Sequence, residues 1–199
     1  MKMIFDKLHQ LYHWLLKWAE HKHNTKALAI LSFLEASIFP LPVDPLLLAM
    51  GFGKPKRSLY YAFLTTLFSV IGALGGYYIG MQVWQQISGF FFQYVFPEAK
   101  FNVVVQSLHG ATFVSIFIAG FSPIPFKIFT IAAGVVGAPL PAFVLGAIAS
   151  RGLRYFILGT LIFFMGDQIR DWIENNFEKL TIAISVAIVL FLALYISLF

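Results

Sequence analysis

The sequence has 199 residues, of which 59% are hydrophobic and 12% are charged, and it carries a formal net charge of +5. Soluble domains contain about 25% charged residues. This composition, with a mean hydropathy of +0.81, therefore excludes a soluble globular domain and predicts an all-α integral membrane protein. The sequence contains no cysteine, which excludes disulfides and cysteine-based metal or redox sites. Because a membrane-spanning helix needs roughly 20 apolar residues, the length allows about four to six membrane segments.

The N-terminal segment, residues 1–26, has the pattern of an amphipathic helix. Apolar residues recur at helical spacing from Ile4 to Ala19, and polar residues fill the opposite face. Such a helix lies in the plane of the membrane interface rather than crossing the bilayer. Packing of the same apolar face on the protein's own helices explains the pattern equally well, so both interpretations stay open.

Residues 27–53 form the first apolar segment, and prolines interrupt it. Three of them fall within six positions, at Pro40, Pro42 and Pro45. Proline removes a backbone donor and clashes with the preceding turn, so a continuous helix is excluded, and each half is too short to span a bilayer. We expect a re-entrant hairpin whose broken backbone is buried in protein or lines a wet cavity.

A basic loop, Lys54–Arg57, separates this hairpin from a spanning helix predicted over 59–80. That helix carries Gly72, Gly76 and Gly80 at four-residue spacing. Small residues at this spacing allow helices to approach closely, and we prefer that interpretation to any ligand-binding role for the glycines. The following segment, 81–100, is amphipathic, and we expect it to end at Pro97.

A second broken segment covers residues 101–138 and contains the motif Gly120–Lys127, with Pro123 and Pro125 inside it. We expect a second hairpin here, followed by a spanning helix over 140–164. Residues 166–199 are predicted to form a polar loop and a C-terminal transmembrane helix.

The two broken segments form an internal repeat. Pro40-Leu41-Pro42 matches Pro123-Ile124-Pro125 at an offset of 83 residues, and the same offset pairs Gly51 with Gly134. The N-terminal segment and the Lys54–Arg57 loop are both rich in lysine and arginine, which predicts that both are cytoplasmic. The first hairpin must then re-enter, and the second must enter from the opposite face. We therefore predict an inverted repeat of hairpin plus transmembrane helix, an arrangement found in many transporters.

Five charged residues lie within the apolar segments: Glu35, Asp44, Lys127, Arg151 and Arg154. Each charge costs at least about 2.5–3.5 kcal/mol at the centre of a bilayer. One explanation is structural, with the two acids neutralising bases. Because three bases face two acids, we favour a net positive pocket that binds the phosphate of an anionic lipid through the lysine and the two arginines. Glu35 and Asp44 are then candidates for gating or proton coupling.

At these residues the sequence resembles the DedA family of membrane proteins, also called the SNARE-associated or VTT-domain family, and most closely its YqaA-like branch. The resemblance covers about residues 27–165. It rests on F-L-E-A-S-I-F-P-L-P-V-D-P at 33–45, G-x-x-x-G-Y-x-x-G at 72–80, G-F-S-P-I-P-F-K-x-F-T-I-A-A-G at 120–134 and S-R-x-x-R-Y at 150–155.

This resemblance implies two opposed re-entrant hairpins in a bacterial inner membrane protein that moves lipids between leaflets. The implied cargo is undecaprenyl phosphate with proton coupling, or phospholipid in a scramblase. Family members usually carry two arginines around the second proline motif, and here Gly120 and Lys127 occupy those positions. Arg151 and Arg154, one helical turn apart, are candidates to replace them.

The sequence thus predicts a transporter or flippase of an anionic lipid, with membrane lipids as partners and with a homo-oligomer left open. It predicts no nucleic-acid partner, because the basic residues are scattered, and no metal or cofactor. An ion-coupled exporter of small molecules and a purely structural membrane protein remain as alternatives. An enzyme is disfavoured, since no metal-ligand spacing or nucleophile–base pair lies beside the breaks.

Overall fold

A computed structural model describes residues 23–37, 43–121, 125–166 and 168. These residues form helices and contain no strand. In chain order the elements are α2 (Asn24–Ser37), α3 (Asp44–Gly53), the short 3₁₀ helix η1 (Pro55–Arg57), α4 (Ser58–Gln82), α5 (Trp84–Tyr94), α6 (Glu98–Ala119), α7 (Phe126–Val135) and a last helix, Leu140–Gly166. The interfacial helix predicted over 1–26 lies almost wholly outside the described residues. So do the breaks at Pro40, Pro42 and Pro123 and nearly all of segment 166–199.

Within the described ranges, three helices are long and apolar enough to cross a membrane: Pro55–Gln82, Glu98–Ala119 and Leu140–Gly166. The first and third coincide with the spanning helices that the sequence predicts over 59–80 and 140–164. By length and composition, the described part of the chain is therefore that of an all-helical integral membrane protein.

Helix α4 has its large apolar residues on the outside and its small and polar residues on the inside. Tyr60, Phe63, Leu67 and Ile71 follow one another at helical spacing, and all are exposed. The buried side consists of residues such as Ala62, Thr65, Ser69, Gly72, Ala73, Gly76 and Gly80. The hydroxyl of Thr65 donates to the Tyr61 carbonyl at 2.8 Å, so its polar atom is satisfied within the helix. This distribution suits a helix that packs in lipid, where small residues make helix contacts.

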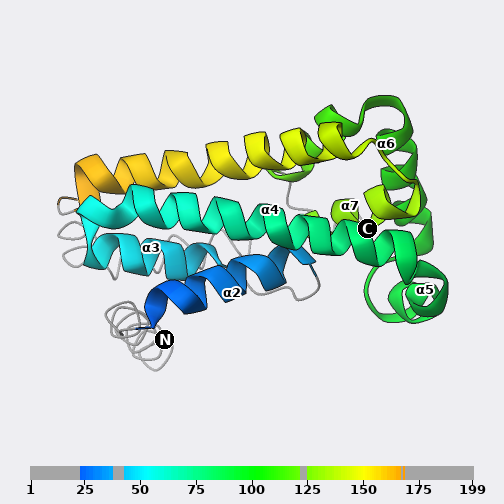
Figure 1. Cartoon of the computed structure of the whole chain (residues 1–199), viewed down its shortest axis with the longest axis horizontal. Coiled ribbons are helices and arrows are strands. Elements are labelled where there is room, and N and C mark those ends of the chain that lie inside the picture. The colour runs from blue at the N-terminus through cyan, green and yellow to red at the C-terminus, as the bar shows by residue number, and fades with distance from the viewer. Residues whose placement is uncertain (1–22, 38–42, 122–124, 167, 169–199) are drawn as a thin grey trace, which may run out of the picture.

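The other helices lie along α4 and at its far end (Figure 1). Helix α3 lies along the half where α4 begins, α2 crosses the middle of α4 near Gly72, and α5, α6 and α7 lie around the end where α4 finishes. The last helix runs antiparallel beside α4, so that Ser58, at the start of α4, donates from its hydroxyl to the Gly159 carbonyl at 2.7 Å. Helix α4 is thus the central element on which α2, α3, α7 and the last helix pack, whereas α6 packs on α7.

The glycine stripe of α4 is a packing surface. A β-carbon on Gly72 would overlap the Phe33 carbonyl of α2, and one on Gly80 would overlap the Ile131 carbonyl of α7. Between them, Gly76 faces the Thr130 side chain of α7. The interpretation of these glycines as residues for close helix packing is therefore confirmed, and backbone meets backbone at both crossings.

Helix α6 differs from the uninterrupted helices because it bends at Ala111, whose φ of −158° and ψ of 66° are not helical. The Ser115 hydroxyl donates to the Ser107 carbonyl at 2.7 Å. The serine side chain thus bridges the two parts of α6 across the bend.

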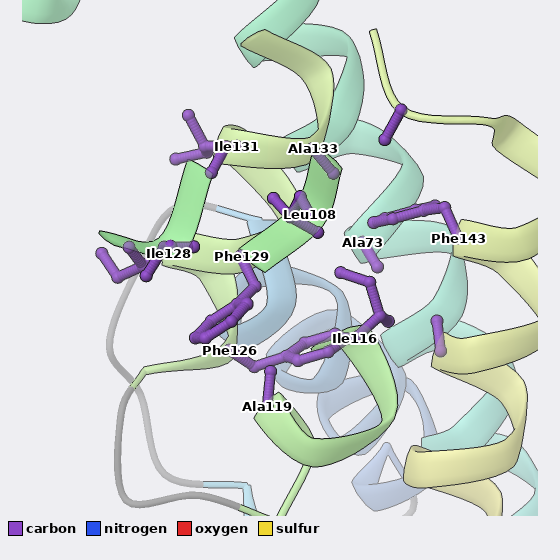
Figure 2. Close-up of a cluster of buried hydrophobic side chains, with 14 of the residues drawn as sticks. Ala73, Leu108, Ile116, Ala119, Phe126, Ile128, Phe129, Ile131, Ala133 and Phe143 are labelled. Atoms are coloured by element: carbon purple, nitrogen blue, oxygen red, sulfur yellow. The ribbon is translucent and has the colours of Figure 1, made fainter. Parts of the chain in front are cut away.

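Apolar side chains fill the space between α6, α7 and the two long helices (Figure 2). Phe126 and Phe129 of α7 lie beside Ile116 and Ala119 of α6, and Phe143 of the last helix joins the same buried cluster. This packing fixes the first turn of α7, which carries Lys127.

The α4–α7 crossing should tolerate no side chain at Gly134. A β-carbon there would overlap the Tyr77 carbonyl of α4, and backbone atoms cannot move aside without separating the helices. We expect Gly134→Ala to destabilise the protein by about 1–3 kcal/mol and to lower the Tm in detergent. Gly89→Ala on α5 is the matched control, because nothing lies within 4 Å of its β-carbon position. Equal melting temperatures for the two variants would contradict the close crossing.

Candidate functional site

The charged residues predicted from the sequence lie where the short helices end or begin. Glu35 is in the last turn of α2, Asp44 begins α3, and Lys127 is in the first turn of α7. Arg151 and Arg154 lie on the last helix, opposite these ends. The structure joins both arginines to the two acids through two ion pairs.

Arg151 is the most buried member of this cluster. Its side chain is 2% exposed, and both terminal nitrogens donate to Glu35 Oε1 at 3.4 Å. The Phe126 ring lies beneath its guanidinium, with 4.1 Å from Cζ to the ring centroid. The planar guanidinium suits such stacking. Arg151 therefore ties α2, α7 and the last helix together.

Tyr155 completes the contacts of this pair. Its hydroxyl accepts from Arg151 Nη1 at 3.0 Å and donates to Glu35 Oε2 at 3.3 Å. Sequence reasoning assigned no role to Tyr155, although it follows Arg151 by four residues, the spacing at which helical side chains meet. Helical spacing from the arginine is the signal that could have identified this residue from the sequence.

Arg154 forms the more open pair. Its Nη2 donates to Asp44 Oδ2, and its Nη1 donates to the Gly120 carbonyl at 3.3 Å. The Arg154 and Asp44 side chains are 33% and 32% exposed. This pair connects the start of α3 to the end of α6 and leaves part of both charged groups accessible.

Gly120 lies where α6 ends, against the last helix. A β-carbon on Gly120 would overlap the side chain of Ser150, so the two helices pack closely there. One turn from Ser150, the guanidinium of Arg154 reaches the Gly120 carbonyl.

Lys127 lies in the turn of α7 that touches α2. The Thr130 hydroxyl, one turn further along, lies 2.9 Å from the Lys127 carbonyl and 3.2 Å from the Ala36 carbonyl of α2. Lys127 is 7% exposed. The ring of the preceding residue, Phe126, stacks on the Arg151 guanidinium. Lys127 therefore lies on α7, and the two arginines lie on the last helix, which contacts α7 through Arg151 and Phe126.

The cluster also has hydrogen-bonding capacity beyond these pairs. Among the described residues, Asp44 Oδ1 and Arg151 Nε are buried atoms without a hydrogen-bond partner. Buried polar groups are nearly always satisfied. One acceptor on Asp44 and one donor on Arg151 therefore remain for a further polar group.

The pairing can be tested with double-mutant cycles. We expect Arg154→Gln with Asp44→Asn, and Arg151→Gln with Glu35→Gln, to show coupling of about 0.5–3 kcal/mol in thermal unfolding, because each pair shares hydrogen bonds. The crossed cycle, Arg151→Gln with Asp44→Asn, is the control, since no direct contact joins those side chains. Coupling as large in the crossed cycle as in the paired cycles would contradict the pairing.

Comparison with known proteins identifies relatives without an established function. No family model and no solved structure matches the chain. An uncharacterized protein of Haemophilus influenzae is 32% identical over 168 residues, which cover 84% of this chain and 87% of that protein. An uncharacterized protein of Histophilus somni, described as a homologue of HI0703, is 33% identical over 185 residues, or 92% and 96% of the two chains. The chain therefore belongs to the family of these uncharacterized bacterial proteins.

Proposed function

We propose that this protein transports an anionic lipid across a bacterial inner membrane, with polyprenyl phosphate or an anionic phospholipid as the cargo. The observation that carries the proposal is the charge cluster at the ends of the short helices. It contains Arg151 and Arg154, each paired with an acid, and the Arg154–Asp44 pair is one-third exposed. A partly exposed arginine suits a lipid phosphate, because its guanidinium offers phosphate a bidentate fork.

An inverted repeat underlies this proposal. Gly51 of α3 packs against Ile162 of the last helix, and Gly134 of α7 packs against Tyr77 of α4. These two glycines correspond at the offset of 83, and each meets the long helix of the other half. In our proposal the two short-helix regions are re-entrant hairpins that enter from opposite faces, with the N-terminus cytoplasmic. Their broken ends then meet near the midplane, where transporters of this type bind substrate.

The ion pairs suggest how an anion would enter. A carboxylate and a phosphate compete for the same guanidinium donors, so Asp44 occupies the anion position on Arg154 when no lipid is bound. A lipid phosphate that displaces Asp44 would keep Arg154 neutralised throughout the exchange. Arg154 is the first contact in this scheme because its side chain is exposed, whereas Arg151 is 2% exposed.

The two acids would couple this exchange to protons. When Asp44 or Glu35 takes up a proton, its attraction for the paired arginine falls, and the arginine becomes available to phosphate. The resemblance to the DedA family, described above, agrees with both the lipid cargo and this coupling. Lys127 would supply a further positive charge from the first turn of α7.

A purely structural role is the second candidate, and the ion pairs themselves favour it. Both acids are engaged by arginines, which connect α2, α3 and the last helix. In that case the cluster holds the helices together and binds no lipid. The two candidates differ in whether transfer, and not only stability, depends on Arg154.

Transfer can be measured in vesicles that contain the reconstituted full chain. We expect the protein to move a fluorescent anionic phospholipid or a fluorescent polyprenyl phosphate between leaflets. The movement is measured by chemical quenching of the label in the outer leaflet. Arg154→Gln should slow transfer by about tenfold to a hundredfold, since a charge-assisted hydrogen bond contributes about 1.5–3 kcal/mol. Lys127→Gln should also lower the rate of lipid transfer.

Lys100→Gln provides the control, because it removes a lysine at the start of α6, outside the charge cluster. Transfer that is unchanged in Arg154→Gln and Lys127→Gln, in variants that melt like the original protein, would remove the assigned roles. Loss of thermal stability in Arg154→Gln without any loss of transfer would favour the structural candidate.

A further inference from the structure

We propose that the basic loop Lys54–Arg57 binds the phosphate of an anionic phospholipid headgroup in the leaflet where α4 begins. This second lipid site lies apart from the charge cluster and does not rest on the transport function. It would hold a resident lipid at the edge of the protein rather than a transported one.

The loop forms a hollow of about 390 Å³ lined by Lys54, Pro55, Lys56 and Arg57. Three cations in four residues surround it, and all three side chains are exposed. The ion pairs between described residues are those of Arg151 and Arg154, so no described carboxylate neutralises the loop. A concave, positively charged surface of this kind is complementary to a phosphate group.

The hollow lies at the level expected for lipid headgroups. The apolar helix Pro55–Gln82 starts within the loop, which lies at the end of the molecule where α3 finishes and α4 begins (Figure 1). Tyr60 follows three residues after the loop and is 52% exposed. Tyrosine is enriched where a spanning helix meets the headgroups, so the cations just before it lie among the phosphates.

Helix dipoles account for only part of this charge. Lys54 follows the C-terminal end of α3, where a cation is stabilised by the helix dipole. Lys56 and Arg57 lie beyond that turn, next to the N-terminal end of α4, where the dipole favours an anion instead. The helix dipoles therefore do not account for these two cations, and an anion bound beside them would be favoured by the start of α4 as well.

The opposite end of α4 has a different chemistry. Residues 81–97 carry no charged side chain, and α5 exposes the aromatic rings of Phe90 and Tyr94 there. Aromatic residues serve any lipid headgroup, whereas cations select anionic ones. The contrast between the two ends assigns the anionic lipid to the leaflet on the side of the loop.

The experiment uses the purified full chain in neutral detergent, with short-chain phosphatidylglycerol as the probe and native mass spectrometry as the measure of bound lipid. Each surface cation contributes about fivefold to binding of anionic lipid. We therefore expect the combined variant Lys54→Gln, Lys56→Gln and Arg57→Gln to bind phosphatidylglycerol about a hundredfold more weakly. Lys56→Gln alone should show about a fivefold loss, which keeps the test open if the combined variant fails to fold.

Lys100→Gln is the matched control, since it makes the same chemical change at the start of α6, and it should bind as the original protein does. The Arg154→Gln background separates this site from the charge cluster, because the loop substitutions should reduce binding there as well. Reduced lipid binding in the loop variants would support this site even if the protein transported no lipid.

Phosphatidylglycerol binding that is unchanged in the combined variant would overturn the proposal. Equal binding of phosphatidylcholine would overturn recognition of charge, and equal binding of inorganic phosphate at the same concentration would overturn the lipid as the source of the anion.

Discussion

The close approach of α4 to α2 and α7 determines where the charged residues lie. At Gly72 and Gly80, backbone carbonyls of the neighbouring helices occupy the positions that a β-carbon would take. In a bilayer, where lipid tails are as apolar as the side chains, such close contact is a main source of helix association. A larger residue at these positions would move α2 or α7 outward, and Glu35 and Lys127 would move with them. The charge cluster therefore depends on glycines that do not belong to it.

The two ion pairs differ in burial, and the difference fits a structural role for one pair and a binding role for the other. The Glu35–Arg151 pair is supported by Tyr155 and by the Phe126 ring, and its arginine is buried, as expected of a pair that holds three helices in place. The Asp44–Arg154 pair is one-third exposed and also uses the Gly120 carbonyl. Desolvation makes a buried pair hard to separate, whereas an exposed pair exchanges partners more readily. This difference is the physical basis for assigning the first contact with an anion to Arg154.

The two ends of the molecule also differ. One end carries the basic loop Lys54–Arg57, and the other carries the uncharged, aromatic helix α5. Such an asymmetry orients a protein in a membrane whose leaflets differ in charge. An anionic lipid near the loop would also contact different groups from those that an anion would contact at the charge cluster. The loop offers flexible cations in water, and the cluster offers guanidinium groups that carboxylates already engage.

The sequence by itself determined the helical class, the spanning segments over 59–80 and 140–164, the packing role of the glycine stripe and the set of charged residues, because composition, spacing and proline act locally. It predicted three bases around two acids but not which acid meets which arginine, since those partners lie more than 100 residues apart. It gave no sign of the bend at Ala111, which a serine hydroxyl accompanies. The spacing of Tyr155 from Arg151 places the two side chains together, but it does not show that Tyr155 also contacts Glu35. The packing of Gly120 against Ser150 and the hydrogen bond from Arg154 to the Gly120 carbonyl appear only in the folded chain. These features depend on which helices pack side by side, and tertiary structure alone decides that.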